Sequence, residues 1–424
     1  MIRVRLRPGR AFGVVRAPPS KSYTHRALVV GHLARRRYRV DDPLDADDTR
    51  ATARAVGALG TPVERSDARW TVEPPEPARL RGVARIDCRE SGTTLRFATA
   101  LAALSDRTVV LRGSGRLPTR PMGPLVATLE RLGATVRTPA GGRTLPLTIR
   151  GPIDAGRVEL DASESSQFAS ALLLALPTLP DASTLLLRGP VVSAPYLDAT
   201  VAILSHHGVE CSRSARTLRV PGGQRYRGDR FAVPGDASSA AYLWAAAAVS
   251  AGEVRVRGIP SSWPQADLAI LDLLERNGAE VRRERDGATV KGTGPRRPFT
   301  VNLTNAPDLY PLVGVLAATT VGRSELRGAR QVVRKESDRR QGTVDLVRGL
   351  GAAVAISGDR LRISGTAAPK ALTLDALNDH RLVMSAAVGS LAASGPSVVG
   401  DARAVRKSFP GFWTVLQELT GGGP

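Results

Sequence analysis

Six short polar segments, each directly before an alanine- or leucine-rich stretch, contain side chains suited to chemistry. These segments are PPSKSYTHR, CRESGTTLR, SESSQF, PGDASSA, NAPDLY and NDHR. A segment that opens a helix places unpaired backbone N–H groups and the positive end of the helix dipole beside its side chains. Such places bind anions, although a single serine or aspartate there is most often only an N-cap. Repetition alone would leave similar caps, whereas these segments differ in chemistry.

Four further loops add cations and acids before a second series of helices: GRLPTRPMG, VVSAPYLD, RKESDR and VRKSFPGF. Only five of the 60 Lys and Arg residues are lysines, and three of those five lie in the candidate loops as Lys21, Lys335 and Lys407. Lysine is a compact donor with a tunable pKa, so its retention in an arginine-rich chain suggests selected chemistry. Together with Asp308 and Glu336, these side chains suit polyanionic substrates and proton transfer without a cofactor.

The polar segments recur at a constant interval. Their spacings are 71, 74, 72, 70 and 72 residues, measured between Lys21, Gly92, Ser166, Ser238, Asp308 and His380. Glycines that end a helical pattern recur in phase, where a helix C-cap favours a positive φ, at Gly60, Gly133, Gly208, Gly278, Gly351 and Gly421. Short strand patterns fill the intervals, so the sequence predicts six β-α-β-α-β-β units.

The sixth unit is cut off after its second helix, and the N-terminal IRVRLRPG resembles the strands that close other units. We therefore expect both chain ends in one discontinuous domain, residues 1–18 plus 235–424. The second domain is predicted over residues 19–234. We expect the active site in the cleft between the two domains.

Composition narrows the classes of function. The 424 residues are 42% hydrophobic and 23% charged, which excludes disorder over most of the chain. The net charge of +21 favours an RNA-binding or RNA-processing protein, the alternative from another class. However, the arginines are spread along the chain and aromatic residues are only 4%, so nucleic-acid binding is not expected.

Location and metal binding are also addressed by the sequence. The apolar stretches are too short to span a membrane and the N-terminus does not resemble a secretory signal, so we expect a cytoplasmic protein. The two cysteines lack zinc-site spacing, and we expect the neighbouring His206 and His207 at the surface. We predict no metal and no cofactor.

Ten ordered segments resemble the motifs of the EPSP synthase family, the 3-phosphoshikimate 1-carboxyvinyltransferases: PSKSYTHR, SGTTLRF, RPMG, SSQF, VSAPY, GDASSA, PDLYPL, RKESDR, NDHR and KSFPGF. The resemblance covers essentially the whole chain. It implies an α/β fold of two inverse α/β-prism domains, each of three β-α-β-α-β-β repeats. It also implies transfer of the enolpyruvyl group of phosphoenolpyruvate (PEP) to the 5-hydroxyl of shikimate 3-phosphate, with release of phosphate through a tetrahedral intermediate.

The resemblance assigns roles to residues. Asp308 would accept the hydroxyl proton, Glu336 is the leading candidate to protonate the PEP methylene, and the share of Lys21 in these transfers stays open. For shikimate 3-phosphate it implies contacts from Lys21, Ser22, Arg26, Ser165, Ser166, Gln167, Ser193, Tyr196, Asp308, Gln331 and Lys335. For PEP it implies contacts from Lys21, Gly92, Arg120, Gln167, Arg339, Arg381 and Lys407.

The sequence departs from the family pattern at three positions. Glu90 and Gln331 stand where many relatives have Asn, and Ala194 stands where many have Lys or Arg. The alternative within the same fold is a UDP-N-acetylglucosamine enolpyruvyl transferase, whose usual cysteine is missing from the loop around Arg120. We expect the two small-molecule substrates as the partners of a monomer.

Overall fold

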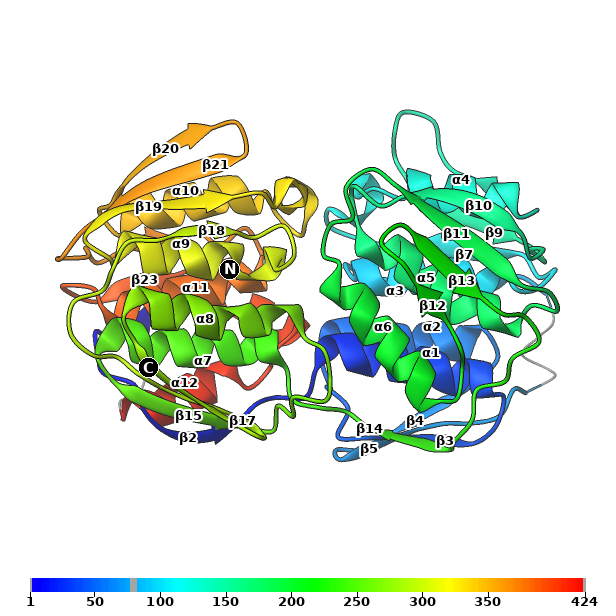
Figure 1. The fold of residues 1–424 in the computed structure, drawn as a ribbon, viewed down its shortest axis with the longest axis horizontal. Helices are drawn as coiled ribbons and strands as arrows, with labels where there is room; N and C mark the ends of the chain where they lie inside the picture. The colour runs from blue at the N-terminus through cyan, green and yellow to red at the C-terminus, as the bar shows by residue number, and fades with distance from the viewer. Residues whose placement is uncertain (1, 77–81, 422–424) are drawn as a thin grey trace. The chain divides into compact units, whose positions relative to one another are not determined.

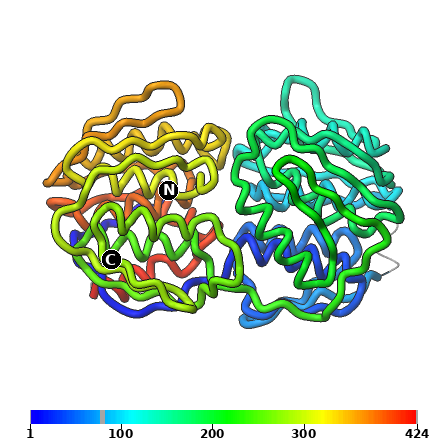
Figure 2. The backbone as a smooth tube through the Cα atoms, in the orientation of Figure 1, coloured from blue at the N-terminus to red at the C-terminus, as the bar shows by residue number. Residues whose placement is uncertain are grey.

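The computed structural model describes residues 2–76 and 82–421. The chain forms two compact units, one of Met1–Pro18 with Gly235–Pro424 and one of Pro19–Pro234. Figure 1 labels the elements of each unit, and the tube in Figure 2 shows that both ends of the chain lie in the same unit. No helix within the described residues is both long and apolar enough to cross a membrane.

Within residues 19–234, the described residues form three four-stranded sheets. Their strand orders are β14-β3-β5-β4, β6-β7-β9-β8 and β10-β11-β13-β12. The strands are β3 (Tyr38–Asp41), β4 (Val63–Arg65), β5 (Arg69–Val72), β6 (Ala84–Asp87), β7 (Val109–Arg112), β8 (Thr135–Arg137), β9 (Leu147–Arg150), β10 (Arg157–Asp161), β11 (Ser183–Arg188), β12 (Ser212–Arg213), β13 (Thr217–Val220) and β14 (Arg230–Ala232). The helices are α1 (Lys21–Ala34), α2 (Asp47–Ala58), α3 (Gly92–Ala102), α4 (Gly123–Arg131), α5 (Ser166–Ala175) and α6 (Pro195–His206), with the 3-10 turns η2 (Leu117–Thr119) and η3 (Leu176–Thr178).

The other unit has two four-stranded sheets and one three-stranded sheet. Their orders are β16-β17-β15-β2, β18-β19-β21-β20 and β1-β23-β22. The strands are β1 (Val4–Leu6), β2 (Phe12–Arg16), β15 (Glu253–Arg257), β16 (Glu280–Glu284), β17 (Gly287–Lys291), β18 (Thr300–Asn302), β19 (Gly322–Arg327), β20 (Ala353–Ser357), β21 (Arg360–Gly365), β22 (Thr373–Leu374) and β23 (Ser397–Val399). The helices are α7 (Ala237–Ser250), α8 (Ala269–Asn277), α9 (Tyr310–Ala318), α10 (Arg339–Gly349), α11 (His380–Leu391) and α12 (Phe412–Thr420), with the 3-10 turns η4 (Ala266–Leu268), η5 (Pro307–Leu309), η6 (Arg330–Arg334) and η7 (Ala402–Lys407).

Every four-stranded sheet repeats one topology. Its first two strands are parallel and its remaining neighbours are antiparallel, as in β10-β11-β13-β12. A parallel pair needs a crossover connection, and within a unit α3, α5, α9 and α11 supply it between β6 and β7, β10 and β11, β18 and β19, and β22 and β23. At the two points where the chain passes from one unit to the other, the strand before the crossing pairs within the unit that the chain leaves. β2 pairs with β15, and β14 pairs with β3. The five four-stranded sheets thus confirm the predicted β-α-β-α-β-β pattern, while the sheet of the sixth repeat has three strands among the described residues.

The sixth repeat is completed from the other end of the chain. β1 pairs antiparallel with β23, with Val4 opposite Val399. The side chain of Leu6 in β1 is buried in the core of this unit. This pairing confirms the prediction that the N-terminal strand closes the last unit.

The first helix of each repeat is buried on nearly all sides. In residues 235–424, α11 is buried at every position and α7 at every position except Ser238. A helix that is apolar all round belongs inside a core, and in Figure 1 α7, α9 and α11 lie between the sheets of their unit. Small residues permit close packing, since a Cβ added at Gly314 of α9 would approach the Thr343 side chain of α10 closer than van der Waals contact allows.

The glycines that were expected to end the second helices adopt the predicted conformation. All six have positive φ, from 62° at Gly421 to 111° at Gly60. The repeat signal in the sequence therefore marks real chain reversals between a helix and the following strands.

The expectation for His207 was wrong, because its ring is buried at 1% exposure. Its Nδ1 lies 2.7 Å from the carbonyl oxygen of Ile203, so Nδ1 donates and Nε2 accepts from the Tyr38 hydroxyl at 2.7 Å. Burial lowers the pKa of His207 to about 4, and the ring stays neutral near pH 7. His206 is exposed, as expected.

Candidate active site

Residues 235–424 hold a buried guanidinium surrounded by three carboxylates. The Arg339 side chain is 1% exposed. It donates from Nε to Asp379 at 2.8 Å, from Nη1 to Asp308 at 2.7 Å and from Nη2 to Glu336 at 2.6 Å. This arrangement brings the two predicted catalytic acids onto one arginine.

Each partner of Arg339 comes from a different polar segment. Asp308 lies in η5 before α9, and Glu336 lies in the turn between η6 and α10. Asp379 is the N-cap of α11, where its Oδ1 accepts from the Arg381 backbone N–H at 2.8 Å. Three separate repeat loops therefore meet at this point.

Two more cations surround Asp308. Arg381 Nη2 lies 3.2 Å from its Oδ2, and Lys335 Nζ lies 3.9 Å from its Oδ1. Burial alone would raise the pKa of the Asp308 carboxyl, and so does Glu336. Three cations outweigh both effects and hold that pKa well below its ordinary value, namely Arg381, Lys335 and Arg339. Asp308 is therefore ionised at neutral pH and can accept a proton.

The other predicted ligands of this unit lie in the same group of loops. Arg381 is 3% exposed, and its Nη1 donates to the Ser238 carbonyl at 3.4 Å. Lys407 Nζ donates to the Asn378 carbonyl at 2.6 Å. Gln331, in η6, donates from Nε2 to the Thr304 carbonyl at 3.0 Å. The backbone thus fixes the position of each of these side chains.

In residues 19–234, Lys21 is the first residue of α1. Its Nζ lies 3.0 Å from Asp48 Oδ2, and the two side chains are 16% and 11% exposed. Asp48 comes from the first turn of α2, so this ion pair joins the two helices of one repeat. Sequence reasoning missed Asp48, although the acid-rich run DDPLDADD signals it.

Arg26 is buried and connects several helices of this unit. Its guanidinium donates to the Ser22 carbonyl at 2.9 Å, the Tyr196 carbonyl at 3.0 Å and the Thr200 hydroxyl at 3.0 Å. Burial lowers the pKa of Arg26 to about 10, which still leaves the side chain charged at pH 7. Three residues predicted for shikimate 3-phosphate, Ser22, Arg26 and Tyr196, are therefore in direct contact.

Two arginine side chains, Arg96 and Arg120, lie at the N-terminus of α3. Ser91 caps the helix by accepting from the Thr94 N–H at 3.2 Å. A Cβ added at Gly92 would lie 2.8 Å from Arg120 Cζ, so glycine lets this guanidinium lie directly against the helix start. Arg96 lies beside the same glycine and donates to the Pro121 carbonyl at 2.8 Å. Backbone N–H groups and guanidinium groups thus converge in an arrangement whose charge suits an anion.

The N-terminus of α5 is linked to that of α3. Ser165 caps α5 by accepting from the Gln167 N–H at 3.2 Å, and Gln167 Nε2 donates to the Thr93 hydroxyl at 3.0 Å. Ser166 is 3% exposed. Ser193 has φ of +54° in the loop before α6. The structure therefore groups the predicted residues of α3 and α5 within this unit.

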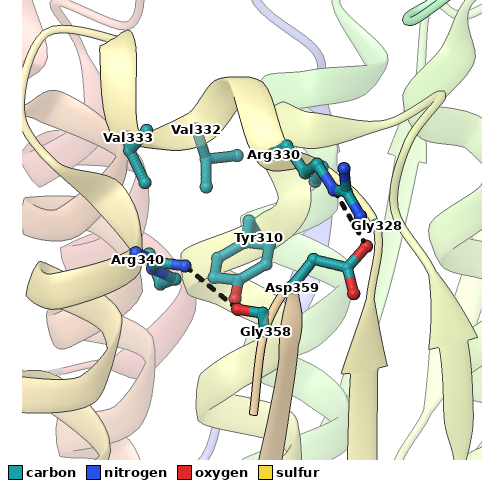
Figure 3. A pocket seen from close by; sticks show the side chains of 9 residues that line it. Tyr310, Gly328, Arg330, Val332, Val333, Arg340, Gly358 and Asp359 are labelled. Atoms are coloured by element: carbon teal, nitrogen blue, oxygen red, sulfur yellow. Dashed lines mark hydrogen bonds and ion pairs between the residues drawn. The ribbon is translucent and has the colours of Figure 1, made fainter. Parts of the chain in front are cut away.

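A cavity of about 320 Å³ lies behind η6 in residues 235–424, as the close-up in Figure 3 shows. In this view the Tyr310 ring lies in the middle of the lining side chains. Arg340 donates to the Gly358 carbonyl, and Arg330 pairs with Asp359. None of the residues predicted for the substrates lines this cavity. The cavity lies between η6, which precedes Lys335, and the turn of the β20–β21 hairpin.

Comparison with solved structures defines the class of fold. EPSP synthase from Acinetobacter baumannii superposes with a TM-score of 0.81 at 24% identity, covering 99% of this chain and 98% of that chain. The enolpyruvyl transferase NikO from Streptomyces tendae superposes with a TM-score of 0.77 at 18% identity, covering 98% and 96%. The chain has the two-domain enolpyruvyl transferase fold that was predicted.

Sequence comparison identifies the family within this class. The model of EPSP synthase (3-phosphoshikimate 1-carboxyvinyltransferase) matches residues 7–416. The 3-phosphoshikimate 1-carboxyvinyltransferases of Halobacterium salinarum and Thermococcus kodakarensis are each 41% identical, covering 97% and 96% of this chain and 97% of each relative. The chain belongs to the EPSP synthase family.

The Arg339 cluster makes a prediction about stability. Replacing Asp379 by Ala removes a buried partner of a buried cation and the N-cap of α11. The free energy of unfolding should fall by about 3 to 5 kcal/mol, measured by urea denaturation. Asp375→Ala is the matched control, because Asp375 is 53% exposed and its ion pair with Arg3 is worth less than about 1 kcal/mol. Equal losses in the two variants would contradict a structural role for the cluster.

Proposed function

We propose that this chain transfers the enolpyruvyl group of PEP to the 5-hydroxyl of shikimate 3-phosphate and releases phosphate. The observation that supports this most strongly is the pair of acids, Asp308 and Glu336, held by one buried arginine among further cations. Both substrates are polyanions, and cations beside acids can bind them while protons move. Family membership supports the same reaction.

The proposed chemistry is an addition followed by an elimination. In the addition, the hydroxyl oxygen bonds to C2 of PEP, the hydroxyl proton passes to Asp308, and a proton reaches C3 from Glu336. In the elimination, the bond between C2 and the phosphate oxygen breaks, a proton passes from C3 back to the Glu336 carboxylate, and phosphate departs. No electrons are exchanged with an external acceptor, so no redox cofactor is needed.

The charges around Asp308 suggest when it becomes a base. In the free protein, three cations keep the pKa of Asp308 low, which makes it a weak proton acceptor. Anionic substrates that bind those cations would take up part of their charge. The pKa of Asp308 would then rise toward a value useful for accepting the hydroxyl proton.

We assign the substrates to residues as follows. Shikimate 3-phosphate would contact Lys21, Ser22, Arg26, Ser165, Ser166, Gln167, Ser193, Tyr196, Asp308, Gln331 and Lys335. PEP would contact Lys21, Gly92, Arg120, Gln167, Arg339, Arg381 and Lys407. Both sets draw on both units, so the proposal requires the two units to act on the same pair of substrates. Since one chain supplies every assigned residue, we propose a monomer, and we place it in the cytoplasm with its phosphorylated substrates.

The activity is tested by phosphate release from PEP. Purified protein should release phosphate when shikimate 3-phosphate is present and should release none with PEP alone. Release with UDP-N-acetylglucosamine but not with shikimate 3-phosphate would replace the proposal by the sister activity. Retention of RNA on a filter at physiological salt, without any phosphate release, would favour the RNA-binding alternative.

The roles of the two acids are tested by isosteric substitution. Asp308→Asn and Glu336→Gln keep the side-chain size and remove the proton-transfer group. Each should lower kcat by about 10²- to 10⁴-fold while KM changes much less, because general acid–base catalysis contributes on that order. Steady-state kinetics with circular dichroism as a folding control measures this. A rise in KM with kcat retained would make these acids binding residues instead.

A further inference from the structure

Asp267 is a buried acid that the proposed mechanism does not use. It lies in η4, and its side chain is 1% exposed. Its Oδ2 accepts a hydrogen bond from the Ser238 hydroxyl, while its Oδ1 has no hydrogen-bond partner among the described residues. A buried carboxylate with one unsatisfied oxygen is costly in its charged form.

The same serine connects Asp267 to Arg381. The Ser238 hydroxyl faces Asp267, and the Ser238 carbonyl accepts from Arg381 Nη1 at 3.4 Å. Gln265, from the same segment as Asp267, fixes this helix start by accepting from the Ala237 N–H at 2.9 Å and donating to the Gly235 carbonyl at 2.8 Å. Asp267 is therefore held at the N-terminus of α7, where Ser238 contacts both Asp267 and the guanidinium assigned to PEP.

The charges that face Asp267 come from three other elements. Asp236 precedes α7, Asp308 lies in η5, and Arg381 lies at the start of α11. Burial is the largest effect that raises the pKa of Asp267, and Asp308 and Asp236 raise it further. Arg381 and the Ser238 hydroxyl partly oppose them, which leaves the pKa at about 7. At neutral pH, Asp267 is therefore poised between its charged and neutral forms.

We propose that Asp267 is a positioning residue for Arg381, and that it binds a proton from solvent when an anionic substrate reaches that arginine. This inference rests on the proposed function, in which Arg381 binds PEP. A new negative charge at Arg381 disfavours the ionised form of a neighbouring carboxyl. The neutral carboxyl no longer repels the negative charge of the substrate, so substrate binding and proton uptake favour one another.

The sign of the pH dependence follows from this linkage. Below about pH 6 Asp267 already holds its proton, and PEP binds without further uptake. Above about pH 7, each further pH unit raises KM for PEP by up to tenfold. The reason is that PEP binding must take up a proton whose concentration in solvent has fallen tenfold. KM for PEP should therefore rise with pH, while kcat follows the pH dependence of the catalytic acids.

The test compares the wild-type chain with Asp267→Asn, which keeps an acceptor for Ser238 and is permanently neutral. At pH 6 the two KM values for PEP should agree within about twofold, and at pH 8.5 the wild-type value should be about tenfold higher or more. The ratio cancels ionisation of the PEP phosphate, which both proteins share. Asp272→Asn is the control, because Asp272 is 71% exposed on α8 and pairs with Arg283, and it should follow the wild type.

The opposite results are equally specific. Identical pH dependence in wild type and Asp267→Asn would overturn the proposal, and so would a loss of PEP binding at every pH in the variant. If Asp267→Asn does not fold, Ser238→Ala provides a second test. Removing the hydroxyl that stabilises the ionised form should move the onset of the KM rise to higher pH, and an unmoved onset would contradict the proposal.

Failure of the proposed function gives a different result. Wild-type protein without turnover at pH 7 contradicts that function and leaves the linkage measurable by carboxyl ¹³C NMR. The Asp267 resonance, assigned by its absence in Asp267→Asn, should titrate at higher pH when PEP is added. An unchanged titration would overturn the linkage whether or not the protein turns over.

Discussion

A buried guanidinium that requires compensating anions is the constraint on which the rest of the candidate site depends. Arg339 is 1% exposed, and three carboxylates from three loops surround it. Leaving such a cation without partners would cost several kcal/mol, so folding must bring those loops together. Since the carboxylates repel one another, further cations gather around Asp308. Charge balance in a buried place thus produces a group of acids and bases that can exchange protons.

The repeat explains why these groups meet at helix starts. The first helix of each repeat is almost wholly buried, and in α7 and α11 the positions beyond the first turn are apolar or small, with tyrosine and tryptophan among them. Polar residues are tolerated at its first turn, where unpaired N–H groups need acceptors. Asp379 and Asp236 both serve as N-caps there, and Arg381 follows within two residues of its cap. In residues 235–424, the polar residues of the candidate site therefore gather at the N-terminal ends of α7 and α11.

Much of the fold was predictable because it rests on local and periodic signals. Glycines such as Gly60 and Gly421 mark helix ends through a backbone requirement, and the missing strand of the sixth repeat predicted the role of β1. The environment of single side chains was not predictable. His207 was expected at the surface, yet its buried ring accepts a hydrogen bond from Tyr38, which lies in β3 and is distant in the sequence. Asp267 drew no attention because its importance comes from Arg381, which lies over a hundred residues away in the sequence.

The central claim, that acids among buried cations move protons to and from the substrates, is tested most directly by running the reaction in D₂O. Addition followed by elimination protonates C3 of PEP, and that carbon then loses one of three hydrogens. Mass spectrometry should therefore find deuterium in the methylene group of the enolpyruvyl product. A product that forms at the normal rate without any deuterium at that carbon would contradict the account.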